Sequence, residues 1–134
     1  MSSLYLLDTN MVIYIQRGVT SVLQKLVAAG RQDVALPSLV VAELAYGVEK
    51  SAHQARNRER LEQLLLEFNV LPWTHSAMWH YAHHFHALRQ KGQPIGHMDL
   101  LIASQALAED ATLVTNNTRE FERIEGLKLE NWVA

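Results

Sequence analysis

The sequence predicts an α/β fold, a three-layer α/β/α sandwich around a mostly parallel sheet. Short apolar runs alternate with longer segments of helical periodicity along the chain, and parallel neighbouring strands require such helical crossovers. The 134 residues, 49% of them hydrophobic, match one ordinary globular core. No repeat, linker or low-complexity tract divides the chain, so we expect a single domain over residues 1–134.

The strands are expected at short apolar runs bounded by polar or turn residues. In chain order these runs are 4–7, 34–36, 70–71, 112–114 and 127–129. The first run ends in Asp8, Thr9 and Asn10, so Asp8 should lie where a buried strand opens into a polar loop. The fourth run is followed by the polar loop 115–118. Sites in open parallel sheets collect at the carboxyl ends of strands, so we expect both segments at one edge.

The helices are expected where apolar residues recur at helical spacing. In chain order these segments are 22–30, 38–48, 53–68, 74–90, about 99–108 and a short turn ending at 123. Gly30 stands where a helix stop is expected, and Lys91-Gly92 ends the longest segment. Ser38, after Pro37, is the expected N-cap of the second segment.

Composition excludes several classes of protein. The chain has no cysteine, so disulfides and thiolate metal sites are excluded, and a metal must use oxygen or imidazole ligands. The N-terminal segment lacks a basic region and its apolar run is interrupted early, which favours a cytoplasmic protein without a membrane span. The formal charge of −2 offers no global attraction to a polyanion, so any nucleic-acid contact requires a local patch.

Three carboxylates are the main candidates for chemistry. Glu43 and Asp99 lie among apolar neighbours, where an isolated charge is costly without a cation. Each acid also has an ordinary structural interpretation: Asp8 as a turn residue, Glu43 at the border of a buried face and Asp99 as a helix N-cap. Together they indicate a hard-metal site, because clustered carboxylates repel one another unless a divalent ion such as Mg²⁺ or Mn²⁺ holds them.

Other polar residues are less specific. Asn117 fits both an N-cap, with Glu120 three residues later, and a position facing the carboxylates. The histidines of HYAHHFH have metal-like spacing, with His80 and His84 one turn apart, but their place beside an apolar stripe favours a solvated face. Cationic side chains that could contact RNA phosphates are Arg56, Arg58, Arg60 and Arg89, and each is equally well explained as an ordinary solvated helix residue.

Four segments in order carry a family resemblance: LLDTN, PSLVVAELAYG, PIGHMDLLIA and LVTNNTREF, followed by the tail IEGLKLENW. Their sequence and separations resemble VapC-type PIN-domain ribonuclease toxins of type II toxin–antitoxin systems over nearly the whole chain. The resemblance implies one PIN domain with a metal cluster at Asp8, Glu43, Asp99 and Asn117. It also implies supporting hydroxyl groups from Ser38 and Thr115.

The resemblance implies metal-assisted hydrolysis of RNA phosphodiester bonds. Asp8 and Asp99 would be direct ligands of Mg²⁺, with Mn²⁺ as a substitute. Glu43 would hold or deprotonate a water, and Asn117 would orient a water or contact the substrate. Asn117 departs from the family pattern, because many PIN nucleases have Asp at this position.

The resemblance also implies partners. Structured RNA is the expected substrate, with tRNA, including the initiator tRNA anticodon stem-loop, a frequent target in the family. A VapB-like antitoxin is expected to cover the groove, and operator DNA is expected to bind only through that antitoxin. A homodimer, or a larger toxin–antitoxin assembly, is the expected oligomer.

Three alternatives compete with this interpretation. A haloacid-dehalogenase-type phosphatase needs a second Asp two residues after Asp8, where this chain has Asn10. A response-regulator receiver needs a phosphoacceptor Asp after a central strand and a late Lys, and segments 36–37 and 113–115 supply neither. A catalytically degenerate PIN domain that binds RNA or protein stays open, because Asn117 removes one negative charge.

Overall fold

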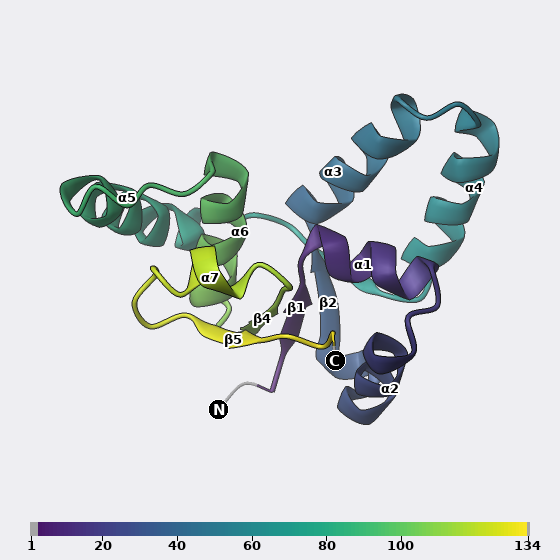
Figure 1. Ribbon diagram of the computed structural model, residues 1–134, viewed down its shortest axis with the longest axis horizontal. Helices are drawn as coiled ribbons and strands as arrows, with labels where there is room; N and C mark the ends of the chain where they lie inside the picture. Colours follow the sequence, from purple (N-terminus) through teal and green to yellow (C-terminus); the bar gives the residue numbers. More distant parts are fainter. Residues whose placement is uncertain (1–2, 134) are drawn as a thin grey trace.

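The computed structural model describes residues 3–133. Its centre is a five-stranded sheet with strand order β3-β2-β1-β4-β5, in which all neighbours pair in parallel (Figure 1). The strands in chain order are β1 (Tyr5–Leu7), β2 (Val34–Pro37), β3 (Asn69–Leu71), β4 (Thr112–Val114) and β5 (Lys128–Glu130). The predicted α/β class and parallel sheet are therefore confirmed.

The helices connect the strands and lie in two groups, α1–α4 on one side of the view in Figure 1 and α5–α7 on the other. In chain order they are α1 (Thr9–Gln16), α2 (Thr20–Ala29), α3 (Ser38–Glu49), α4 (Gln54–Leu65), α5 (His75–Gln90), α6 (His97–Ala108) and α7 (Thr118–Phe121). A single 3-10 turn, Arg31–Asp33, precedes β2. Within the described residues, no helix combines the length and apolarity that a bilayer crossing requires.

The order of the strands positions the site. From the central β1 the chain winds through β2 to β3, and it then crosses back to β4 and β5 on the other flank. The winding therefore reverses between β1 and β4, where Leu7 pairs with Val114. Loops that leave two such strands diverge and open a crevice at their carboxyl ends. Asp8 and Thr115 are the first residues after these two strands.

The core lies between the sheet and its helices and fixes the ends of the central strands. Leu6 and Leu113, from adjacent positions of β1 and β4, are fully buried. Ile102 from α6 and Phe121 from α7 are fully buried as well. Burying side chains of this size contributes about 1.5–3 kcal/mol each. The residues that follow β1 and β4 are thus attached to strand ends whose side chains are fully buried in the core.

Two helix starts differ from the sequence predictions. Ser38 is the first residue of α3 and not its N-cap; Pro37 occupies the cap position without a side-chain bond. The Ser38 hydroxyl instead accepts a hydrogen bond of 3.2 Å from the backbone N–H of Trp73, which follows β3. Helix α6 begins at His97, so Asp99 lies inside its first turn and the N-cap interpretation of Asp99 is wrong.

Candidate active site

Asp8 is a buried carboxylate at the carboxyl end of β1, with 7% of its surface exposed. It caps α1: its Oδ1 accepts a hydrogen bond of 2.7 Å from the backbone N–H of Thr9. Its Oδ2 accepts another, also of 2.7 Å, from the hydroxyl of Thr115 after β4. Burial raises the pKa of Asp8, and these two hydrogen bonds oppose that rise. Both oxygens are thus held in place, and each keeps a lone pair for a further ligand.

Glu43 is joined to the same region by Thr9. The Thr9 hydroxyl donates a 2.6 Å hydrogen bond to Oε1 of Glu43, which links the first residue of α1 to the middle of α3. Glu43 is half-buried, and no ion pair within residues 3–133 involves it. The cationic partner expected from its apolar surroundings is therefore absent from the described residues, and a neutral hydroxyl group occupies that place.

Asp99 carries the clearest sign of clustered negative charge. Its burial, and then the charges of Asp8, Glu120 and Glu43 in that order, raise its pKa from 3.8 to about 6. Carboxylates perturb one another in this way only over short distances. The structure thus brings the three sequence-predicted acids into one electrostatic cluster.

Asn117 and Glu120 complete the cluster from the segment after β4. Asn117 occupies the N-cap position of α7, as predicted, but its side chain makes no cap hydrogen bond. Its Nδ2 instead donates a 2.7 Å hydrogen bond to Oε2 of Glu120. The Asn117 backbone N–H donates a 3.0 Å hydrogen bond to Oγ1 of Thr115, which itself binds Asp8.

For Glu120 the sequence predicts only a capping role, as the partner of Asn117. The spacing of three residues was the visible signal, but it fits a cap as well as a site. The structure favours a place in the site, because the negative charge of Glu120 contributes to the raised pKa of Asp99. Thr9, which orients Glu43, was also missed, since a threonine after a strand-end Asp has no specific signature.

The donor set fits a hard divalent cation. The available donors are carboxylate and amide oxygens, which suit Mg²⁺ or Mn²⁺. Among residues 3–133, no three His, Asp or Glu side chains converge as a ready-made ligand set. Mg²⁺ does not need one, because it is usually bound by one or two carboxylates and keeps several waters. Of the four histidines in the HYAHHFH segment of α5, His83 and His86 are exposed, whereas His80 and His84 are partly buried.

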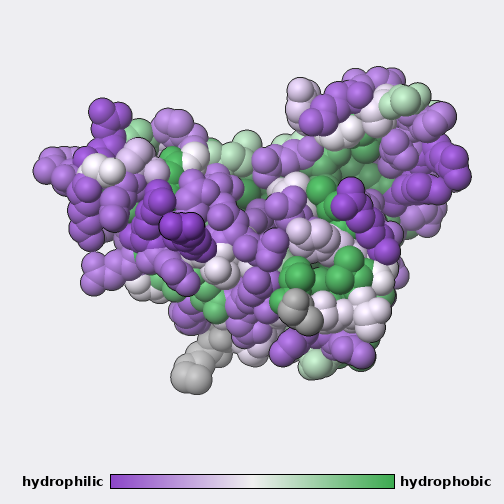
Figure 2. Space-filling model, viewed as in Figure 1, coloured by the Kyte–Doolittle hydropathy of each residue, from purple (hydrophilic) through white to green (hydrophobic). Residues whose placement is uncertain are grey.

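A cleft of about 1710 Å³ runs along α1, α3 and α4 and reaches the cluster at Thr9, Glu43 and Met98. Small-molecule pockets rarely exceed about 1,000 Å³, so its size suits a macromolecule. Figure 2 shows apolar surface between the arms of the α3–α4 hairpin, bordered by hydrophilic side chains. The cations that line the cleft are Arg17, Lys50, Arg56 and Arg60.

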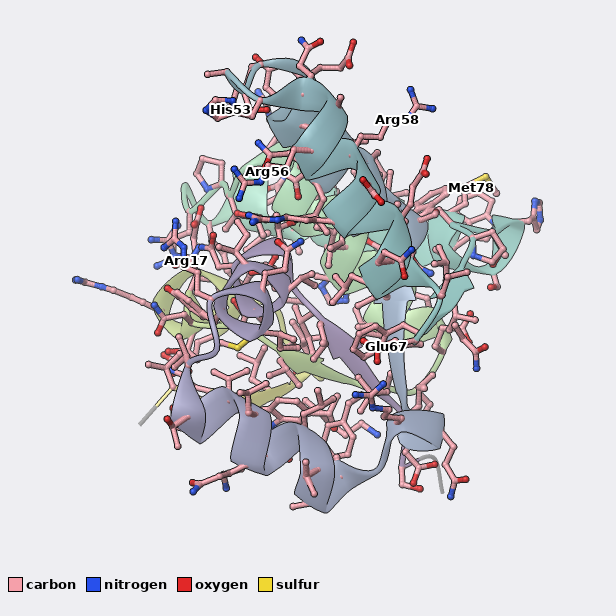
Figure 3. All side chains as sticks on the ribbon, turned by 90° about the vertical axis from the view of Figure 1, so that its right-hand side faces the viewer. Arg17, His53, Arg56, Arg58, Glu67 and Met78 are labelled. Carbon is pink, nitrogen blue, oxygen red and sulfur yellow. The ribbon has the colours of Figure 1, made fainter. Side chains whose placement is uncertain are left out.

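The structure separates the four arginines proposed from the sequence. Arg56 and Arg60 line the cleft. Arg58 forms an ion pair of 3.3 Å with Glu62 and lies on the other side of α4 from Arg56 and Arg17 (Figure 3). Arg89 lies over the ring of Phe85, beside a small pocket between α5 and α6. Arg17, on α1, is a cleft cation that the sequence did not single out.

Comparisons with known proteins agree with this geometry. Residues 5–127 match the PIN domain family. "Ribonuclease VapC2" of Rickettsia felis is 43% identical over 131 residues, covering 96% of this chain and 98% of that protein. "tRNA(fMet)-specific endonuclease VapC" of Shigella flexneri is 33% identical over 128 residues, covering 96% and 97%. The crystal structure of VapBC2 from Rickettsia felis, bound to a DNA fragment from its promoter, has a TM-score of 0.90 at 41% identity, covering 96% and 98%.

Proposed function

This chain belongs to the PIN-domain family and is a VapC-type ribonuclease, and from that premise we propose that its carboxylate cluster is the active site of a toxin endoribonuclease. One observation carries the proposal. Asp8 is buried at the reversal point of the sheet, and burial together with the neighbouring carboxylates raises the pKa of Asp99 to about 6. Carboxylates so arranged destabilise the folded state unless they bind a cation.

Asp8 and Asp99 are the residues that would hold the cation. PIN-domain ribonucleases generally depend on a divalent metal, and Mg²⁺, with Mn²⁺ as a substitute, is the ion we propose. When bound, the ion supplies Lewis-acid stabilisation of the phosphate and a water of lowered pKa. The Thr9 backbone N–H and the Thr115 hydroxyl orient Asp8 by donating hydrogen bonds to its two oxygens, and both bonds oppose the rise in its pKa that burial causes.

The remaining residues act on the water and the substrate. The Thr9 hydroxyl occupies Oε1 of Glu43, which leaves Oε2 to accept a proton from the attacking water. Asn117 fixes Oε2 of Glu120 and leaves its own carbonyl oxygen for a water or a substrate hydroxyl group. Glu120 supplies the negative charge that Asn117 lacks, which supports a catalytic interpretation over a degenerate PIN domain.

RNA is the proposed substrate, and tRNA is the proposed class, since the Shigella flexneri relative is named for tRNA(fMet). The solved Rickettsia felis relative is a VapBC assembly, which supports a VapB-type antitoxin as the partner of this chain. We further propose that the chain forms a homodimer, and that operator DNA is bound through the antitoxin.

The test is RNA cleavage by protein purified from its antitoxin. We expect the wild type to cut structured RNA with Mg²⁺ or Mn²⁺ and to stop in EDTA. Asp8→Asn and Asp99→Asn should each lower the cleavage rate at least about 100-fold, because each removes a cation ligand. Induced expression should arrest bacterial growth in the wild type alone, with discrete RNA fragments.

A matched control is Glu122→Gln, which removes an exposed carboxylate just after α7 and should cleave like the wild type. Metal-dependent cleavage that persists in Asp8→Asn, in a preparation free of contaminating nuclease, would falsify the site assignment. Absence of cleavage in the wild type, with RNA binding intact, would favour the degenerate alternative.

A further inference from the structure

One face of α3 leads outward from the active site along the cleft. Glu43, Tyr46, Gly47 and Lys50 follow at helical spacing, so they share this face, and all four line the cleft. At 1.5 Å per residue, Tyr46 stands about 4.5 Å and Lys50 about 10.5 Å beyond Glu43 along the helix axis. An RNA strand with a phosphate at the carboxylates would thus pass Tyr46 first.

Tyr46 is unusually exposed for an aromatic residue, with 65% of its surface accessible. Gly47, the next residue on this face, carries no side chain, and outside its chain neighbours no atom lies within 4 Å of the position that a Cβ would take there, so the cleft is open at this point. Lys50 places its Nζ 5.1 Å from the Tyr46 ring centroid. An aromatic face next to a cation is the combination with which proteins bind unpaired nucleotides.

The charges of the cleft favour a polyanion. Arg17, Lys50, Arg56 and Arg60 take part in none of the ion pairs found within residues 3–133. Of the three acids in the cleft, Glu67 is already paired with Arg31 and Glu43 belongs to the active site. Only Glu59 remains to oppose the four cations, so the cleft has local positive charge despite the net charge of −2.

We propose that Tyr46 is the platform on which an unpaired base, next to the phosphate to be cut, stacks. Lys50 and the cleft arginines contact the phosphates on either side. The proposal rests on the proposed nuclease function and adds a substrate class to it: RNA that is single-stranded at the cut, because bases within a duplex are already stacked on each other. A peptide segment of an antitoxin in this cleft is the competing occupant.

The experiment compares Tyr46→Ala with Tyr46→Phe, both in an Asp8→Asn background that keeps the RNA intact. The probe is a stem-loop RNA with 2-aminopurine in its unpaired loop, and the fully paired duplex of the same stem is the second probe. We expect Tyr46→Ala to raise the Kd for the stem-loop about five- to 150-fold, the range for one stacked base. It should also abolish the quenching of 2-aminopurine. Tyr46→Phe keeps the ring and should stay within about twofold.

Trp79→Ala is the matched control. Trp79 is an equally exposed aromatic, 70% accessible, but it lies on α5 outside the cleft, so its loss should leave both readouts unchanged. Circular dichroism and thermal unfolding then verify that Tyr46→Ala is folded.

Three results would overturn the stacking platform: equal affinities of Tyr46→Ala and Tyr46→Phe, equal losses for stem-loop and duplex, or a loss confined to an antitoxin peptide. The nuclease proposal fails separately. Wild-type protein that binds and quenches the stem-loop but never cleaves RNA would overturn the nuclease function and leave the platform standing.

Discussion

At the residue scale, the ionisation of Asp99 depends on its burial and on the neighbouring carboxylates. The sequence allows two interpretations of Asp99: an acid at a helix start, which stabilises the helix, or a metal ligand, which lowers stability until a cation binds. The structure retains both features, since Asp99 lies in the first turn of α6 and has a raised pKa. The pattern of apolar neighbours could indicate that Asp99 was unusual, but the distances to the other acids depend on the fold.

The pH dependence of stability distinguishes these two contributions. A carboxyl with a pKa of 3.8 when unfolded and about 6 when folded binds its proton more tightly in the folded state. Stability therefore falls as pH rises from about 4 to about 6, and the loss persists above that range. Without divalent cations, Asp99→Asn should raise the free energy of unfolding by about 1 kcal/mol at about pH 8, after discounting for the screening of a half-buried group.

Urea denaturation in EDTA at about pH 8 and about pH 3.5 measures this difference. It should nearly vanish at the lower pH, because the Asp99 carboxyl is then protonated in the folded protein and mostly protonated in the unfolded chain. Glu122→Gln, an exposed acid, should show no such gain. A loss of stability in Asp99→Asn at about pH 8 would mean that the helix-start contribution dominates and that the cluster is weaker than the structure indicates.

At the scale of elements, the strands and helices could be predicted where periodicity was strong, and all five predicted strands are present. The helix starts near Ser38 and Asp99 could not be predicted, and at Ser38 the reason is a tertiary contact that takes the hydroxyl away from a cap. The chain after β3 runs between α3 and α6: Trp73 bonds Ser38 through its backbone N–H, and its Nε1 donates a 2.9 Å bond to the carbonyl of Leu101. No local pattern around Ser38 reports a partner 35 residues away.

Gln105 of α6 binds the chain at the end of β3, and a negative charge at this position should lower the stability of the protein. It is fully buried, and its Nε2 donates to the carbonyls of Leu71 and Pro72 at 2.9 and 3.2 Å. Gln105→Glu would place an uncompensated carboxylate against two carbonyl oxygens. We expect a loss of about 3 kcal/mol or more at neutral pH, which shrinks at lower pH as the new carboxyl is protonated. Urea denaturation measures it.

Gln24→Glu, the same substitution on the exposed face of α2, serves as the reference and should change stability by less than about 0.5 kcal/mol. If Gln105→Glu were as stable as this reference variant, the two hydrogen bonds would contribute little, and another contact would have to hold the end of β3 to α6.

At the scale of the whole molecule, the sequence could predict that RNA binding must be local, since the formal charge is −2. It could not predict which cations share a surface. Arg56, Arg58 and Arg60 look equivalent in a charged helix, yet a two-residue step turns a side chain by about 200° around the helix axis. Arg17 comes from another helix altogether, so only the fold brings it to the same cleft.

The salt dependence of RNA affinity tests whether only the cleft-lining arginines of α4 contact RNA. Each phosphate contact on single-stranded nucleic acid adds about 0.7 to the slope of log K against log salt. Arg56→Gln and Arg60→Gln should therefore each weaken binding and reduce the slope by about 0.7, because both line the cleft. Arg58→Gln removes the same charge between them, but its partner is Glu62, so affinity and slope should match the wild type. Filter binding of the stem-loop RNA over a range of KCl, in the Asp8→Asn background, gives all four slopes. Equal reductions in the three variants would show that RNA responds to the charge of α4 as a whole and does not follow the cleft to the carboxylates.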